Sequence, residues 1–92
     1  MCGCGSNITD LGCFPSCEDI NTRINATVTG NWTVRICFNG VWLTKEVGCT
    51  VGQAIVIEND YPENILLVMQ LIKPDGKPMS AQLYSFKNKI CV

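Results

Sequence analysis

Apolar and polar residues alternate without interruption from Asp19 to Thr29. The members of one face are Ile20, Thr22, Ile24, Ala26 and Val28. The residues between them are Asn, Arg and Thr. Because successive side chains of a strand point to opposite faces, this segment is predicted to be a strand with one buried face. Gly30-Asn31 then breaks the pattern.

An Asn39-Gly40 pair separates two further alternating segments, Trp32–Phe38 and Val41–Val47. Asn-Gly accepts positive φ at both central positions, as a two-residue hairpin turn requires. This turn predicts the residue pairs on each face of the hairpin. On one face Phe38 pairs with Val41, Ile36 with Leu43, Val34 with Lys45 and Trp32 with Val47. On the other face Cys37 pairs with Trp42, Arg35 with Thr44 and Thr33 with Glu46. The first set is apolar apart from Lys45, so we expect it to face the core.

The rest of the chain after residue 50 contains shorter segments of the same kind. Residues 53–58 and 83–92 are predicted strands. The apolar run 64–72 fits either a strand buried on both faces or a buried helical turn, and the Pro74-Asp75-Gly76 turn directly after it favours the strand. Short strands separated by turns predict an all-β fold, a small antiparallel β-sandwich of the immunoglobulin-like type.

Residues 1–18 do not alternate. This segment contains four of the seven cysteines among Gly, Ser, Asn and Asp, and Pro15 removes a backbone donor. We therefore divide the chain into an irregular Cys-rich N-terminal arm, residues 1–18, and a β-sandwich domain, residues 19–92. Residues 1–7 have no basic region, apolar segment or cleavage site, so we expect synthesis in a host cytoplasm without a signal peptide.

Composition narrows the possible functions. Only 16% of the 92 residues are charged, against about 25% in ordinary soluble proteins, so we expect a partner or further copies of the chain to cover part of the surface. A net charge of −1 argues against nucleic-acid binding, and no apolar run is long enough for a membrane span. Histidine is absent, which removes histidine-based catalysis. We expect no enzyme, no catalytic residues and no cofactor.

The cysteines leave several alternatives open. Cys2, Cys4, Cys13 and Cys17 could bind Zn²⁺, although the Cys-x-Cys spacing is tighter than structural zinc sites use, and we assign no metal. They could also form disulfides within the arm or with Cys49 or Cys91, or remain free thiols. Cys37, Cys49 and Cys91 have no close cysteine neighbour in the sequence, so for them a buried thiol is favoured.

The predicted hairpin register places Trp42 on the outward face, near Cys37, Arg35 and Glu46. An outward Trp can stack on a sugar ring or anchor a protein interface, unless another strand or the arm covers it. Arg35 and Glu46 are diagonal neighbours in this register, so we expect a weak surface ion pair between them.

Three segments carry a resemblance. The segment Leu11-Gly12-Cys13-Phe14-Pro15-Ser16-Cys17, the hairpin Phe38-Asn39-Gly40-Val41 and the turn Pro74-Asp75-Gly76 resemble small virion proteins of tailed phages that infect Bacteroidetes, the crAss-like phages among them. This resemblance covers most of the chain. It implies an auxiliary (decoration) capsid protein or part of a head fibre, with a β-sandwich body and an arm that docks on the shell. It implies no catalytic residues.

We therefore expect a non-enzymatic structural protein of a phage virion, present in many copies and bound to other capsid subunits. The candidate partner-binding residues are Cys2, Cys4, Ile8, Leu11, Cys13, Phe14, Cys17 and Trp42. The alternatives are a glycan- or receptor-binding module of a virion fibre that uses Trp42, and a small zinc or thiol module built on the arm cysteines.

Overall fold

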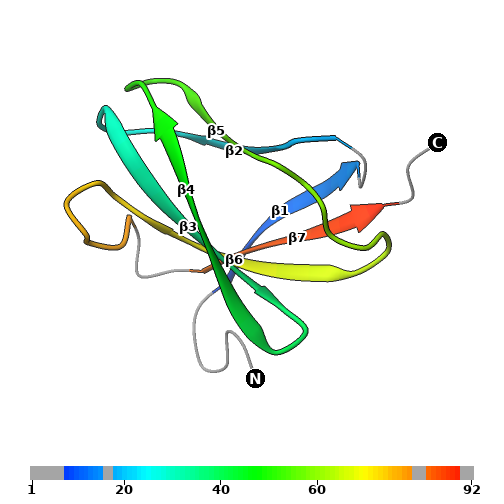
Figure 1. Cartoon of the computed structure of the whole chain (residues 1–92). Helices are drawn as coiled ribbons and strands as arrows, with labels where there is room; N and C mark the ends of the chain where they lie inside the picture. Colours follow the sequence, from blue (N-terminus) through cyan, green and yellow to red (C-terminus); the bar gives the residue numbers. More distant parts are fainter. Residues whose placement is uncertain (1–7, 16–17, 80–82, 90–92) are drawn as a thin grey trace.

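The computed structural model describes residues 8–15, 18–79 and 83–89, and these form strands and loops (Figure 1). The strands are β1 (Ile8–Pro15), β2 (Ile20–Asn25), β3 (Gly30–Phe38), β4 (Val41–Cys49), β5 (Ala54–Ile57), β6 (Leu66–Ile72) and β7 (Leu83–Lys89). The described residues contain no helix, so none of them provides a helix able to span a membrane. The all-β prediction is confirmed.

Two sheets make up the fold. One has five strands in the order β1-β7-β6-β3-β4, and the other pairs β2 with β5. All neighbours are antiparallel except β1 and β7, which run parallel. The prediction of a purely antiparallel sandwich is therefore corrected to one mixed and one antiparallel sheet. A parallel pair needs a long connection, and here nearly the whole domain lies between the two strands.

The β3–β4 hairpin has the predicted register at every position from Trp32–Val47 to Phe38–Val41. On β3 the predicted core face is buried, with Trp32, Val34 and Ile36 almost fully covered. On β4 the same face is open near the turn, where Val41 is 57% and Leu43 is 40% exposed, whereas Val47 is half-buried against the core. Among the described strands β4 lies at the edge of the sheet beside β3, and its turn end is less covered than β3.

Other strands differ from their predictions in length or burial. The segment 19–29 forms a strand only over β2, where Arg23 has a φ of 60° and the register with β5 shifts between Asn21 and Asn25. The run 64–72 is a strand, as predicted, but only one of its faces is buried. Leu66 on the other face is 66% exposed.

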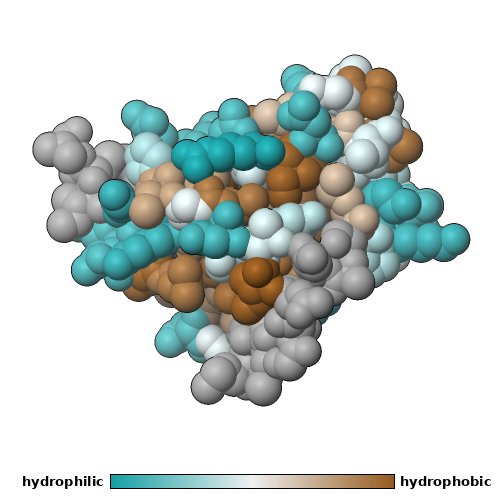
Figure 2. All heavy atoms as spheres, turned by 180° about the vertical axis from the view of Figure 1, so that it is seen from behind, coloured by the Kyte–Doolittle hydropathy of each residue, from teal (hydrophilic) through white to brown (hydrophobic). Residues whose placement is uncertain are grey.

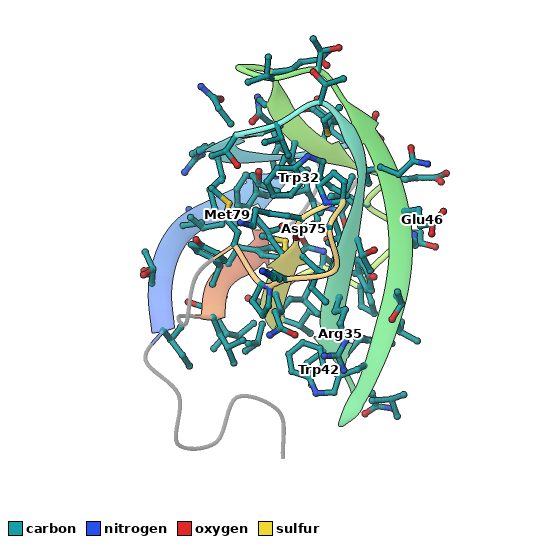
Figure 3. The ribbon with its side chains drawn as sticks, turned by 90° about the vertical axis from the view of Figure 1, so that its left-hand side faces the viewer. Trp32, Arg35, Trp42, Glu46, Asp75 and Met79 are labelled. Atoms are coloured by element: carbon teal, nitrogen blue, oxygen red, sulfur yellow. The ribbon has the colours of Figure 1, made fainter. Side chains whose placement is uncertain are left out.

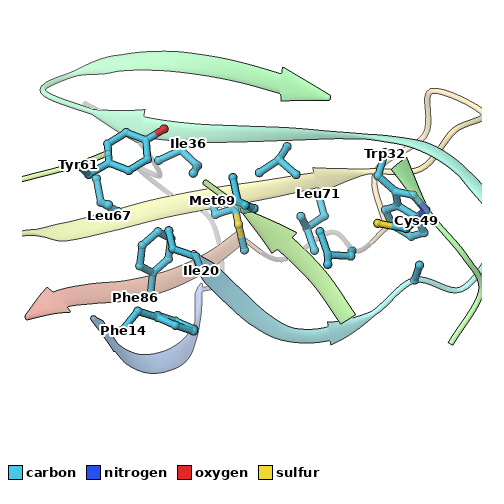
Figure 4. Close-up of a cluster of buried hydrophobic side chains, with 14 residues drawn as sticks. Phe14, Ile20, Trp32, Ile36, Cys49, Tyr61, Leu67, Met69, Leu71 and Phe86 are labelled. Carbon is cyan, nitrogen blue, oxygen red and sulfur yellow. The ribbon is translucent and has the colours of Figure 1, made fainter. Parts of the chain in front are cut away.

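The hydrophobic core lies between the two sheets (Figure 4). Its largest side chain is Trp32 on β3, whose indole Nε1 donates a hydrogen bond to the carbonyl oxygen of Val28 at 3.0 Å. A buried Trp needs a partner for its only donor, and the turn after β2 supplies one. Ile20, Ile55 and Ile57 from the smaller sheet complete the core from the other side.

The predicted irregular arm is corrected for the residues that the structure describes there. Residues 8–15 form β1 and pair with β7. Phe14 is only 4% exposed and packs edge-on against Phe86, with 5.3 Å between ring centroids. Burying an aromatic ring stabilises the fold enough to order a segment that lacks alternation. Residues 1–7, 16 and 17 lie outside the described ranges.

Candidate interaction surface

The outer face of the five-stranded sheet, turned away from the core, carries a cluster of three side chains from adjacent strands. The Arg35 guanidinium on β3 lies over the Trp42 ring on β4, with its carbon 4.9 Å from a ring centroid (Figure 3). Arg35 Nη1 also donates a hydrogen bond to Gln70 Oε1 on β6 at 2.8 Å. Trp42 is half-buried on this face, as the hairpin register predicted.

The chemistry of this cluster suits an acidic or polar partner. A guanidinium has five N–H donors and no acceptor, so the bond to Gln70 leaves others for a partner. The aromatic ring holds the guanidinium in place through a cation–π contact. Together Arg35 and Trp42 present an anchored positive charge beside partly exposed apolar surface.

The expected ion pair between Arg35 and Glu46 is absent from the structure. In the described part of the chain the ion pairs are Lys45–Asp60 at 3.4 Å and Lys73–Asp75 at 3.9 Å. Arg35 is held instead by Trp42 and Gln70. Glu46 points away from that pair (Figure 3). Exposed ion pairs contribute little, so the stacked and hydrogen-bonded position of Arg35 prevails.

Apolar side chains reach the surface in several places, and hydrophobic atoms interrupt the hydrophilic surface in the rear view (Figure 2). The large exposed ones among the described residues are Ile8, Val28, Val41, Leu43, Val51, Val56 and Leu66. Leu66 projects from the same face of β6 as Gln70, since the two are separated by an even number of residues. The outer face therefore combines the Arg35 cluster with exposed apolar area.

The partner-binding candidates of β1 have different positions. Ile8 is exposed at the start of the strand, and Cys13 is an exposed free thiol. Leu11 is half-buried against the core. Phe14 lies in the core, so its assignment to a partner surface is corrected. Cys2, Cys4 and Cys17 lie outside the described residues.

The three described cysteines differ in burial and in whether the sulfur is free or disulfide-bonded. Cys49 is a buried free thiol, as predicted, and burial raises its pKa. Cys37 is disulfide-bonded, which corrects the prediction of a buried thiol at this position. Cys13, by contrast, is a free thiol. Residues 8–15, 18–79 and 83–89 contain no group of three or more His, Cys, Asp or Glu side chains suited to a metal ion.

A buried polar cluster around Asn88 on β7 was not predicted. Asn88 and Asn59 exchange amide hydrogen bonds of 3.0 and 3.1 Å. Asn88 Nδ2 also donates to the carbonyl oxygen of Pro62 at 3.2 Å, and Asn59 Nδ2 donates to that of Pro15 at 2.7 Å. These bonds hold the loop between β5 and β6 against β7 and β1. Isolated asparagines in a sequence carry no signal that could have revealed this pairing.

Comparisons with protein-family models, curated proteins and solved structures found no match for this chain. Function is therefore inferred from the chemistry of the surface. The described residues offer two features for this purpose, the Arg35 cluster on the outer face and the open edge of β4.

Proposed function

We propose that this chain is a non-enzymatic structural protein of a phage virion, an auxiliary capsid protein that binds other capsid subunits through the outer face of its larger sheet. The observation that carries the proposal is the Arg35–Trp42–Gln70 cluster on that face. Trp and Arg are enriched among the residues that dominate binding energy in protein interfaces. The low charge of the chain and the exposed Leu66 support the same proposal.

The strand order supports an immunoglobulin-like variant of the sandwich as part of this proposal. In variable-type immunoglobulin domains one sheet contains strands G, F, C and C′ in that order, and the other contains B and E. The order β7-β6-β3-β4 and the pair β2-β5 correspond to these positions. The buried Trp32 on β3 matches the buried Trp of strand C. β2 and β6 contain no cysteine, so the inter-sheet disulfide of antibody domains is not part of the proposal.

Binding to isolated phage capsids that lack this protein tests the proposal. We expect the full chain to co-sediment with the particles in many copies, and Trp42→Ala and Arg35→Ala to weaken binding by about tenfold or more, since truncation at an interface anchor costs more than 1–2 kcal/mol. The control is Val51→Ala, which truncates an exposed apolar side chain beyond the opposite end of β4. Absence of co-sedimentation, or equal loss in all three variants, contradicts the proposal.

Glycan or receptor binding through Trp42 is the second candidate function, and the partial exposure of this ring on the outer face favours it. The Arg35 guanidinium covers part of the ring, so a sugar would stack on the opposite side. A glycan array probed with the wild type and Trp42→Ala tests this candidate. Glycan binding requires that the wild type gives a signal on at least one sugar and that Trp42→Ala removes it. Absence of signal on every glycan excludes this candidate for the sugars tested.

A further inference from the structure

The two edges of the five-stranded sheet differ in their protection. At the β1 edge, Arg23 Nη1 donates to the carbonyl oxygen of Leu11 at 2.6 Å and Nη2 to that of Cys13 at 3.3 Å. The register of β1 with β7 also shifts between Asp10 and Cys13. Bulges and covered backbone groups are two of the means by which proteins block an edge. The β1 edge is therefore closed to a further strand.

Within the described residues the β4 edge has no bulge and no side chain bound to its outward backbone groups, although it carries the charges of Lys45 and Glu46. β4 has nine residues, a continuous register with β3, and no proline. Among the described strands, β3 is its one neighbour in the sheet (Figure 1). A long regular edge of this kind is a template for pairing with another strand.

The backbone groups available on β4 follow from the hairpin. In a two-residue hairpin the residues next to the turn form a hydrogen-bonded pair, and hydrogen-bonded pairs then alternate along the ladder. Val41, Leu43 and Lys45 therefore direct their backbone groups toward β3. Trp42, Thr44 and Glu46 direct theirs outward, and no hydrogen bond to them is found within the described residues.

We propose that β4 pairs antiparallel with β4 of a second copy of this chain, with the twofold axis through Thr44. The two five-stranded sheets then form one continuous sheet. The exposed Val41 and Leu43 lie along the new boundary and are partly covered by it. This inference goes beyond the proposed function, because it concerns association of the free chain with itself.

Charge and the length of strand that remains paired together select the register. An axis through Lys45 places Lys45 opposite its own copy, and an axis through Glu46 does the same for Glu46. Like charges directly opposite each other are destabilising in a sheet. An axis through Thr44 avoids both: it pairs Thr44 with itself, Leu43 with Lys45, Trp42 with Glu46 and Val41 with Val47. This register also keeps most of the strand paired.

The Thr44-centred register gives Glu46 an opposite charge. Glu46 has no ion-pair partner in the parts of its own chain that the structure describes. Across the boundary it lies opposite Trp42 of the second copy, and Arg35 of that copy lies over this ring. Because the axis is twofold, the same contact forms twice. The pairing thus combines backbone hydrogen bonds, apolar burial and charge complementarity on a single edge.

The mass of the purified full chain in solution tests the proposal. We expect sedimentation velocity to show a dimer that dissociates on dilution, and Thr44→Pro to raise the dissociation constant by about tenfold or more, because it removes an outward N–H and its hydrogen bond. Proline is tolerated where the N–H of an edge strand faces solvent, so the β3–β4 ladder remains. Thr44→Val keeps the N–H and should still dimerise. Circular dichroism verifies that both variants are folded.

A cysteine variant tests the register and does not depend on proline. In a hydrogen-bonded antiparallel pair the Cα atoms are about 5.5 Å apart, within the range that a disulfide spans. Mild oxidation of Thr44→Cys should give a covalent dimer in which peptide mapping links residue 44 to residue 44. The matched control Lys45→Cys should not link to itself.

Three results overturn the proposal. They are a monomer at every concentration up to the millimolar range, a dimer that folded Thr44→Pro leaves unchanged, and self-linking at residue 45 in place of residue 44. None of these results depends on capsid binding. Failure of the capsid assay with an intact dimer contradicts the proposed function alone.

Discussion

Asn88 and Tyr61 are two buried polar residues with opposite hydrogen-bonding states. Asn88 has no exposed surface, and its amide bonds to Asn59 and to backbone carbonyls. Tyr61 is also buried, but its hydroxyl has no hydrogen-bond partner. Satisfied buried polar groups specify a packing arrangement, whereas an unsatisfied one costs free energy. Removal of the polar atoms should therefore lower the free energy of unfolding at Asn88 and leave it unchanged or raise it at Tyr61.

Asn88→Ala is expected to destabilise the protein strongly. The substitution leaves the Asn59 amide and two backbone carbonyls with fewer partners, which should lower the free energy of unfolding by about 2–4 kcal/mol. Urea unfolding monitored by Trp fluorescence measures this loss. Lys89→Ala, at an exposed position of the same strand, serves as the control and should change it by less than about 0.5 kcal/mol. Equal effects of the two variants would show that the amide cluster contributes nothing.

Tyr61→Phe is expected to leave stability at neutral pH unchanged or to raise it by up to about 1 kcal/mol, because it removes an unsatisfied buried hydroxyl and keeps the ring. The ring packs edge-on against Phe38 at 5.6 Å between centroids, and phenylalanine preserves this contact. The same urea assay measures the effect. A loss of about 1 kcal/mol or more would mean that the hydroxyl has a partner in solution.

At the scale of elements, Arg23 adds side-chain contacts to those that already hold β1 against β7. Arg23 on β2 donates to the carbonyl oxygens of Leu11 and Cys13 and lies over the Phe14 ring, with 4.7 Å from its guanidinium carbon to the centroid. Its φ of 60° is unfavourable for a non-glycine residue, and the register shift in β2 places it there. The local conformational cost is offset by contacts that hold the edge strand.

Arg23→Lys should loosen β1 while keeping the positive charge, since an ammonium group cannot donate from two separate nitrogens to two carbonyls. We expect amide hydrogen exchange in β1 to accelerate about fivefold or more, which corresponds to about 1 kcal/mol. Exchange in β3 and β4 should stay unchanged and provides an internal control. If β1 exchanges at the wild-type rate, charge alone accounts for the role of Arg23.

Local chemistry explains which elements could be predicted. The β3–β4 register follows from Asn39-Gly40 and from alternation, which act between residues close in the chain. The pairing of β1 with β7 joins residues 8–15 to 83–89, and no turn motif in the sequence links these two strands directly. Trp42 could be placed on the outward face for the same local reason. Its contact with Arg35, and the link from Arg35 to Gln70, required the position of β6.

The whole molecule is expected to lose stability at alkaline pH. Burial raises the pKa of the Cys49 thiol above its ordinary value, and burial together with repulsion from Asp60 raises the pKa of the Tyr61 hydroxyl in the same way. The unfolded chain releases these protons at lower pH than the folded chain does. Each contribution is therefore complete below the unfolded pKa and disappears as pH rises through the folded one.

Urea unfolding at a series of pH values from 7 to above 10, without reductant, measures this alkaline loss. The double variant Cys49→Ala and Tyr61→Phe should show a smaller decrease in the free energy of unfolding above pH 9, whatever its stability at pH 7. An equally steep decrease in the wild type and the double variant would assign the loss to other groups.

The sequence by itself determined the all-β class, most strand positions and the register of the hairpin, because side-chain alternation and turn residues act over short distances. Only the tertiary structure decided that residues 8–15 are a sheet strand with Phe14 in the core, and that Cys37 is disulfide-bonded. It also decided that β4 lies at an open edge where Val41 and Leu43 are exposed. These features depend on which strands become neighbours, and that is set by packing between residues far apart in the chain.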